Sequence, residues 1–320
     1  MSSPVSSAVD HLPEAMQPIM CCLGERVAGK PTQFMWERAI AAGQLDWRAI
    51  TIQLAAQDLQ VALAGMYVMR IMGLRLFPSL QTTALQYLAA EQERLLFIGR
   101  VTSAVRGPHA WQAWHNWGGA ILAWGAQQAD LRNATCWLHG DSVECRSVWV
   151  ALLEGVAAGA DLPHTVLWSE PPVGVTPRWD IGAEVQLVQL ESTEQGLSHI
   201  SEMQADDASG SDTQGKTSSQ PQASPVLLLV GEQLLAGSGP GVGGADAMWR
   251  CVADSGVHCL VAGGARAVQQ AKAWTHSSLQ VMPLAEQIVA CEAYDFRRWT
   301  GSPVASHVLR DAYDEYNGFE

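Results

Sequence analysis

The stretch Leu131–Val156, LRNATCWLHGDSVECRSVWVALLEGV, decides the fold. It predicts a short apolar strand, a sharp turn after Gly140, and an amphipathic helix over Ser147–Val156. In α/β proteins built from two nucleotide-binding halves, this strand–turn–helix unit binds the phosphates of a dinucleotide. The turn here is His-Gly-Asp-Ser-Val-Glu instead of a run of glycines. The central question is therefore whether the chain uses such a site or keeps only its shape.

Strands and helices alternate on both sides of this stretch. The strands predicted before it are Pro18–Leu23, Trp47–Leu54, Leu74–Phe77 and Val101–Arg106; those within and after it are Cys136–Leu138, Thr165–Trp168, Ala183–Leu190, Val226–Val230 and His258–Val261. Crossovers of helix length join parallel strands. The expected fold class is therefore α/β, with a parallel-sheet N-terminal domain and a doubly wound, Rossmann-like second domain.

Other segments are predicted to be helical or unstructured. Trp111–Gln128 reads as a loop leading into a helix, and Pro283–Trp299 as a long amphipathic helix followed by a last one. Ser201–Ser224 is rich in Ser, Gln, Asp and Gly, so it cannot bury enough apolar surface to offset its ordering entropy and is predicted to be a disordered insertion. Gly237–Gly244 reads as a Gly-rich loop and residues 1–17 as a flexible leader.

Composition excludes several classes of function. The net charge of −13 opposes binding to nucleic acid, because phosphate backbones are also negative. We expect no membrane span, since no apolar run reaches about 18 residues. The seven cysteines contain no CxxC pair, which predicts reduced thiols, a cytoplasmic location and no metal site.

Three motifs, in this order and spacing, resemble the shikimate dehydrogenases. They are the opening run Leu23–Phe77, the Trp-His-Asn-Trp-Gly-Gly step at Trp114–Gly119, and IVACEAYDFRRWTGSP at Ile288–Pro303, which carries the Phe-x-x-Trp-Thr-Gly signature. The resemblance implies an N-terminal domain that binds shikimate and a Rossmann domain that binds NADP. The family reaction is the NADP-dependent interconversion of 3-dehydroshikimate and shikimate in aromatic amino-acid biosynthesis.

The resemblance also implies domain boundaries. Residues 18–112 correspond to the substrate-binding domain and 113–280 to a degenerate Rossmann-like domain that carries the insertion 201–224. Residues 281–320 correspond to C-terminal helices that return to the first domain.

The family's acid/base residues are replaced in this chain. The catalytic Lys corresponds to Gln81, whose amide cannot exchange a proton with an alcohol at neutral pH. The Asp that partners this Lys corresponds to Trp117, which can neither carry that charge nor take that proton. No catalytic residue is therefore expected at the family positions.

The substrate-pocket positions are changed as well. By the resemblance they are Thr32, Arg75, Thr102, His115 and Cys291. Arg75, with Arg100, could bind the carboxylate of a small anionic ligand or could serve in salt bridges. His115 could be an acid or base or a structural residue, and Cys291 a nucleophile or a small buried filler.

The cofactor loop keeps only its first glycine. The family's Gly-x-Gly-Gly-x-x-x-Arg falls on Gly140, Asp141, Ser142, Val143, Glu144, Cys145 and Arg146, or one residue off. Val143 places a branched side chain where the pyrophosphate approaches, and Asp141 and Glu144 place negative charge there. We therefore expect that the chain binds no cofactor. If the chain is active, the expected cofactor is NADP. Asp141 and Ser142 could instead be N-cap residues of the following helix.

Three functions remain open from the sequence. The first is a shikimate dehydrogenase-like protein that has lost catalysis, because the Lys, the Asp and the glycine loop are absent together. The second is an active oxidoreductase of that family with a relocated site that uses His115 or Lys30. The third is a non-enzymatic binding or scaffolding module, for which the sequence names no protein partner.

Overall fold

The computed structural model describes residues 17–88, 92–172, 185–190, 195, 198, 226–231, 257–272 and 279–318. Residues 1–16 of the predicted leader, the insertion Ser201–Ser224 and the loop Gly237–Gly244 lie outside these residues. The chain divides into two compact units: Met1–Ile121 with Ala285–Glu320 form unit 1, and Leu122–Leu284 form unit 2.

Unit 1 is built on a mixed sheet with the strand order β2-β1-β3-β4-β5. The strands are β1 Ile19–Gly24, β2 Arg48–Gln53, β3 Gly73–Leu76, β4 Ser103–Arg106 and β5 Trp111–Trp114. β1 pairs in parallel with β2 and β3, as predicted, whereas β4 and β5 run antiparallel. The all-parallel prediction for this domain is thus wrong at one side of the sheet.

The antiparallel pair explains a second correction. The sequence predicts a loop at Trp111–Trp114, but this segment forms the outermost strand, β5, because a tight turn returns the chain onto β4. In this turn the Gly107 N–H donates to Ala110 O at 3.0 Å. The hairpin ends at Trp114, and the next helix begins two residues later at Asn116.

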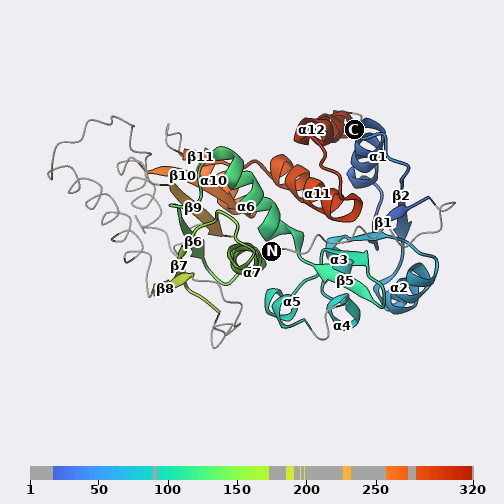
Figure 1. The fold of residues 1–320 in the computed structure, drawn as a ribbon, viewed down its shortest axis with the longest axis horizontal. Coiled ribbons are helices and arrows are strands. Elements are labelled where there is room, and N and C mark those ends of the chain that lie inside the picture. The colour runs from blue at the N-terminus through green and yellow to red at the C-terminus, as the bar shows by residue number, and fades with distance from the viewer. Residues whose placement is uncertain are drawn as a thin grey trace. The chain divides into compact units, whose positions relative to one another are not determined.

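Helices flank both faces of this sheet. They are α1 Thr32–Ala42, α2 Leu59–Val68 after a 3₁₀ turn at Ala56–Asp58, α3 Pro78–Gln81, α4 Leu85–Leu88, α5 Glu93–Ile98, α11 Leu284–Thr300 and α12 Ser306–Gly318. In Figure 1, α1, α11 and α12 lie on one side of the strands, and α2 and α4 lie on the other.

The core of unit 1 joins the C-terminal helices to the first strands. Trp299 of α11 packs edge-on against Trp36 of α1 with ring centroids 4.8 Å apart, and its Nε1–H donates to Ala104 O at 2.9 Å. A Cβ at Gly73 would lie 2.7 Å from the Trp299 ring, so only glycine allows this approach. The Phe-x-x-Trp-Thr-Gly signature therefore serves packing: Phe296 and Trp299 are both buried.

Unit 2 contains a fully parallel sheet with the order β11-β10-β9-β6-β7-β8. The strands are β6 Thr135–His139, β7 Thr165–Ser169, β8 Gln186–Leu190, β9 Val226–Gly231, β10 His258–Gly263 and β11 Leu279–Val281. This is the order of dinucleotide-binding sheets, with the switch point between β6 and β9. The helices are α6 Asn116–Gln128, which begins in unit 1, α7 Val143–Ala157 and α10 Ala265–Lys272.

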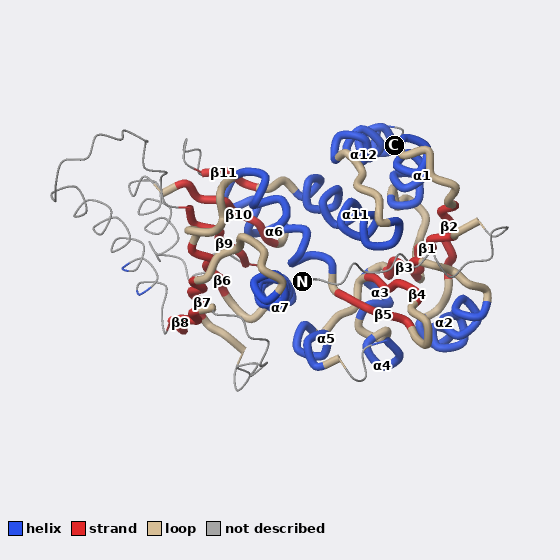
Figure 2. The backbone as a smooth tube through the Cα atoms, viewed as in Figure 1, coloured by secondary structure: helices blue, strands red, loops and turns tan. Residues whose placement is uncertain are grey.

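The inner strands of this sheet are apolar on both faces. Every residue of β6 and of β9 is buried, which is typical of a parallel sheet with both faces covered. Figure 2 shows the strands of unit 2 side by side in the order given above, with α6 and α7 along one side. The α/β fold class, with a Rossmann-like order in the second sheet, is confirmed.

Among the described residues, no helix is long and apolar enough to cross a membrane.

Candidate functional site

The pocket positions of unit 1 converge on a buried ion cluster around Arg75. Arg75 lies on β3, and the two carboxylates that face it, Glu292 and Asp295, lie on α11. Arg75 Nη1 is 3.3 Å from Asp295 Oδ2, and Arg75 Nε is 3.4 Å from Glu292 Oε1. Both carboxylates are almost fully buried, with side chains 3% and 0% exposed. Such charges are stable in a protein interior only when they are paired.

Asp295 is the best-satisfied member of this cluster. It accepts hydrogen bonds from Ser103 Oγ at 2.6 Å, Trp114 Nε1 at 2.8 Å and Asn116 Nδ2 at 2.7 Å. These donors come from β4, β5 and the first residue of α6. We call Arg75, Glu292, Asp295 and the three donors the Arg75 cluster. It ties the sheet of unit 1 to α11.

Glu292 is less well satisfied. Thr32 Oγ1 donates to its Oε1 at 3.5 Å, but Glu292 Oε2 has no hydrogen-bond partner within the described part of the chain. Burial raises the pKa of Glu292 to about 7, although Arg75 acts in the opposite direction. Near neutral pH this carboxyl group therefore carries a proton for part of the time.

His115 and Cys291 lie in the same positive field. Burial, with Arg75 and Arg100, lowers the pKa of His115 to about 3, so its imidazole is neutral at physiological pH. Burial raises the pKa of Cys291 to about 12, although Arg75 lowers it. The protonated thiol of Cys291 is a poor nucleophile. The imidazole of His115, with a pKa of about 3, is a poor proton acceptor. Neither residue has the properties of an acid/base or nucleophilic group at neutral pH.

The other predicted site residues are engaged in internal contacts. Gln81 is buried and its Nε2 donates to Leu76 O at 3.0 Å. Trp117 Nε1 donates to Gln287 Oε1 at 3.3 Å. Thr102 Oγ1 accepts the backbone N–H of Asn116 at 2.8 Å and lies 3.3 Å from Trp114 O. The structure thus brings Thr32, Arg75 and Thr102 around the cluster, where they bind other side chains or backbone of this chain.

The turn before α7 in unit 2 is the candidate cofactor loop. α7 begins at Val143, earlier than the predicted Ser147, because Ser142 is its N-cap: Ser142 Oγ accepts the N–H of Cys145 at 3.2 Å. The N-cap interpretation of Ser142 is confirmed. Asp141 instead forms a two-bond ion pair with Arg146, Nε–Oδ1 2.5 Å and Nη2–Oδ2 2.7 Å.

Gly140 adopts a left-handed backbone with φ +84°, and both its polar groups are in use. Its N–H donates to Ser169 O at 2.9 Å, and its carbonyl accepts Trp168 Nε1–H at 3.0 Å. A pyrophosphate needs free backbone N–H groups and a positive local field at this place. Here a serine caps the helix and a carboxylate stands beside it. The residues of this loop do not fit NADP in the usual mode.

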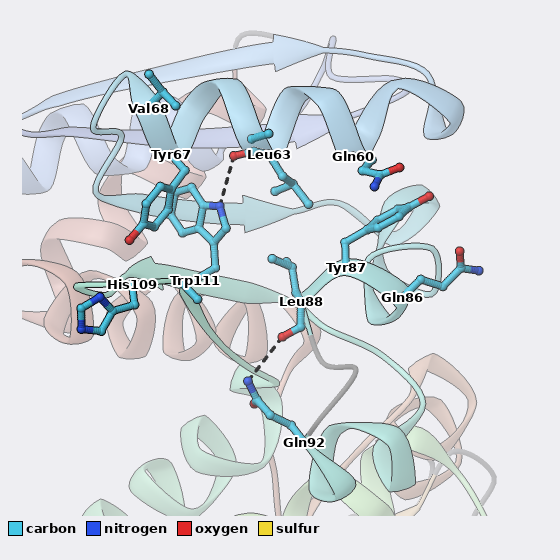
Figure 3. A pocket seen from close by; sticks show the side chains of 12 residues that line it. Gln60, Leu63, Tyr67, Val68, Gln86, Tyr87, Leu88, Gln92, His109 and Trp111 are labelled. Atoms are coloured by element: carbon cyan, nitrogen blue, oxygen red, sulfur yellow. Dashed lines mark hydrogen bonds between the residues drawn. The ribbon is translucent and has the colours of Figure 1, made fainter.

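Unit 1 also contains an open groove (Figure 3). Its volume is about 980 Å³, and one wall is the α2 stripe of Gln60, Leu63, Ala64, Tyr67 and Val68. Trp111 reaches across to this wall, where its Nε1–H donates to Leu63 O at 3.2 Å (Figure 3). The remaining lining residues are Gln86, Tyr87, Leu88, Gln92, His109 and Ala110. None of these side chains is a carboxylate, a lysine or an arginine.

No group of His, Cys, Asp and Glu side chains in the described regions is arranged to hold a metal ion. The six described cysteines are all free and buried.

Comparison with known proteins identifies the fold. No protein-family model and no curated protein sequence matches the chain. Solved structures do match over nearly its whole length, among them 5-ketofructose reductase of Gluconobacter sp. strain CHM43, at 14% identity and a TM-score of 0.59, covering 94% of this chain and 99% of that one. This chain has the fold of the shikimate dehydrogenases.

Two shikimate dehydrogenase structures support this statement. The enzyme from Listeria monocytogenes, in complex with shikimate and NAD, has 13% identity and a TM-score of 0.59, with 92% of this chain and 96% of that chain covered. The enzyme from Thermus thermophilus, in complex with NADP(H) and shikimate, has 16% identity and a TM-score of 0.54, with 93% and 99% covered. At these identities the likeness concerns the shikimate dehydrogenase fold, and not the activity.

Sequence reasoning missed the two carboxylates that complete the Arg75 cluster. Glu292 and Asp295 are spaced i, i+3 and therefore lie on one face of α11, the face that also carries buried Val289, Phe296 and Trp299. The sequence signal was the presence of two acidic residues within an apolar helix face. Buried carboxylates require a partner, so this pattern indicates a paired site.

Proposed function

We propose that this chain is a shikimate dehydrogenase-like protein that has lost catalysis. One observation carries the proposal: Arg75, at a substrate-pocket position of unit 1, is paired with two buried carboxylates of the chain itself, Glu292 and Asp295. A carboxylate ligand of Arg75 would have to displace Glu292 or Asp295, which lie 3.4 and 3.3 Å from this guanidinium. Leaving buried charges without their partners is strongly unfavourable.

The acid/base positions support the same proposal. Gln81 stands at the Lys position, and its amide donates to the backbone carbonyl of Leu76, the last residue of β3. Trp117 stands at the Asp position, and its indole is bound to Gln287. Neither group can transfer a proton at neutral pH. His115, the nearest alternative by sequence, has a pKa of about 3 and cannot take up a proton near pH 7.

A turnover assay tests the proposal. We expect purified protein to show no NADP-dependent oxidation of shikimate above the rate of a blank, under conditions in which an active shikimate dehydrogenase serves as positive control. A measurable rate would count against the proposal only if it changes in a Gln81→Ala variant. A rate unaffected by substitutions in this pocket would indicate a contaminating enzyme.

The alternative is an active oxidoreductase with a relocated site. It stays open because 5-ketofructose reductase, a reductase of a different substrate, has the same fold. This alternative requires a bound nicotinamide cofactor, whatever its substrate. A ligand at 100 times its Kd stabilises the folded state by about 2.7 kcal/mol. Thermal melts with NADP and with NAD at millimolar concentration therefore separate the two: an unchanged melting temperature supports the silent protein, and a clear rise supports the oxidoreductase.

A binding module is a second candidate, favoured by the groove of unit 1. Exposed large apolar side chains gather on its α2 and α4 walls or next to them: Val61 at 77% exposure, Val68 at 79%, Met69 at 61% and Tyr87 at 39%. Such patches often mark interaction surfaces. Val68→Ser is the test variant and Val61→Ser a control outside the lining. A complex lost with the first and kept with the second would support a partner at this groove.

We also propose that the protein acts in the cytoplasm. Its described cysteines are buried free thiols, as is usual in a reducing compartment. Localisation of a tagged chain in fractionated cells tests this.

A further inference from the structure

We infer that the carboxylate of Glu292 occupies an anion site at Arg75. When the Glu292 side chain is removed, the same site binds a small free monocarboxylate. The inference deepens the proposed function, on which its biological meaning rests, because it identifies what fills the pocket position at Arg75. The site it predicts is an anion site for planar carboxylates of the size of formate or acetate.

The geometry around Glu292 is that of a carboxylate site that is only partly satisfied. Three donors face this carboxylate: Arg75 Nε, Thr32 Oγ1 and the indole N–H of Trp36. Arg75 Nε and Trp36 Nε1 both lack a hydrogen bond within the described residues, and so does the acceptor Glu292 Oε2. Because Glu292 is tethered to α11, it approaches Arg75 only to 3.4 Å. A free carboxylate can rotate into the two-bond geometry that guanidinium groups prefer.

The Nε edge of Arg75 depends on Glu292 alone among the described residues. Arg75 Nη1 is shared by Asp295 and Ser103, at 3.3 and 3.4 Å. The neighbouring titratable groups do not compete for Nε. Burial keeps the thiols of Cys291 and Cys22 protonated, since it raises both their pKa values, and His115 is neutral. Truncation of Glu292 therefore leaves the buried Nε edge of Arg75 without an acceptor, while Asp295 still pairs with Nη1. A buried donor without an acceptor is costly, which favours the uptake of a small carboxylate that can accept from it.

The space released also matches the ligand. Glu292→Ala removes one methylene, one further carbon and two carboxylate oxygens, which are the heavy atoms of acetate. The lining is polar, so the cavity is not of the dry apolar kind. The Arg75 side chain is 14% exposed, although its Nε atom is buried.

The experiment measures the melting temperature of the full chain in sodium formate and sodium acetate, against sodium chloride at equal ionic strength and pH 7.5. For Glu292→Ala we expect a saturable rise of about 3 °C or more by 100 mM formate, as for a ligand of millimolar Kd. The wild type should not respond. Glu286→Ala is the matched control on the same helix: it removes a half-exposed carboxylate, and its partner Arg310 keeps Asp314, so formate should not stabilise it.

Two results would overturn the inference. One is a Glu292→Ala protein that melts at the same temperature in formate and chloride; the other is an equal response in the wild type. If Glu292→Ala is unfolded in chloride, formate must restore its folded circular-dichroism spectrum, and failure to do so also overturns the inference. The double variant Arg75→Met/Glu292→Ala should not respond. None of these outcomes depends on turnover, so the proposed loss of catalysis stands or falls separately.

Discussion

The Arg75 cluster in unit 1 and the loop before α7 in unit 2 are held in place by different physical means. In unit 1 the pocket positions contain buried charges: Asp295 is fully buried and holds four side-chain partners. In unit 2 the loop is held at the surface by the cap of Ser142 and by the Asp141–Arg146 ion pair, whose side chains are 38% and 27% exposed.

This difference predicts which substitutions lower the free energy of unfolding most. Buried ion pairs cost much when one partner is removed, because the other charge stays behind in a low-dielectric interior. Exposed ion pairs contribute little, since water and salt screen them. Substitutions in the cluster should therefore change folding strongly, whereas substitutions in the loop should change it weakly.

The largest effect is expected for Arg75→Met, which leaves Glu292 and Asp295 without their cation. We expect a loss of about 3–5 kcal/mol in the free energy of unfolding, measured with urea at pH 7.5. Arg146→Met is the matched control in unit 2 and should cost no more than about 1 kcal/mol. Equal losses for the two variants would break the comparison.

The second effect is a pH dependence that belongs to unit 1. Because the folded-state pKa of Glu292 is raised from 4.5 to about 7, the folded protein binds more protons than the unfolded chain between these values. This contribution is fully present below pH 4.5 and is lost as the pH rises through 7. One pKa unit is worth about 1.36 kcal/mol, so the loss is on the order of 3 kcal/mol at most.

Glu292→Gln isolates this contribution. His115 has the opposite sign, because its lowered pKa removes stability as the pH falls below about 6.5, so the wild-type curve alone mixes the two. The stability of Glu292→Gln minus that of the wild type should rise between about pH 5 and pH 8.5. A difference that is flat over this range would show that Glu292 is not buried as described.

A smaller effect is expected at the cap of α7. Ser142→Ala removes the acceptor of the Cys145 N–H and should cost about 1 kcal/mol, as N-cap serines usually do. Ser142→Asp keeps an acceptor and should restore most of this loss. Urea unfolding of the three proteins measures it, and a neutral Ser142→Ala would contradict the assigned cap.

The smallest effect is expected for Asp141→Ala, which removes a half-exposed partner of Arg146. Its stability should stay within about 1 kcal/mol of the wild type, and the difference should shrink in about 1 M NaCl. A large, salt-independent loss would mean that the loop is held as rigidly as the Arg75 cluster.

Much of the fold could be predicted because its signals are local. The strand–turn–helix at β6 and α7, and the capping serine, follow from short patterns of apolar, glycine and hydroxyl residues. β5 was missed because Trp111–Trp114 is only four residues long and becomes a strand by pairing with β4. Short strands of this kind are defined by their neighbours more than by their own sequence.

The candidate site was predictable only in part. The replacement of the acid/base residues by Gln81 and Trp117 is visible by resemblance to the family. The occupation of Arg75 is not, because its partner Asp295 is 220 residues away and no local pattern connects them. Only the fold brings β3 and α11 together and converts a candidate anion-binding arginine into part of a closed cluster.

The most direct test of the central claim is titration calorimetry of the wild-type protein with NADP and shikimate, separately and together. If both sites are closed by the chain's own side chains, no binding heat should be detected at millimolar ligand, while an active shikimate dehydrogenase in the same cell binds both. Saturable binding of NADP that Asp141→Ala strengthens, or of shikimate that Arg75→Met abolishes in a folded protein, would contradict the account.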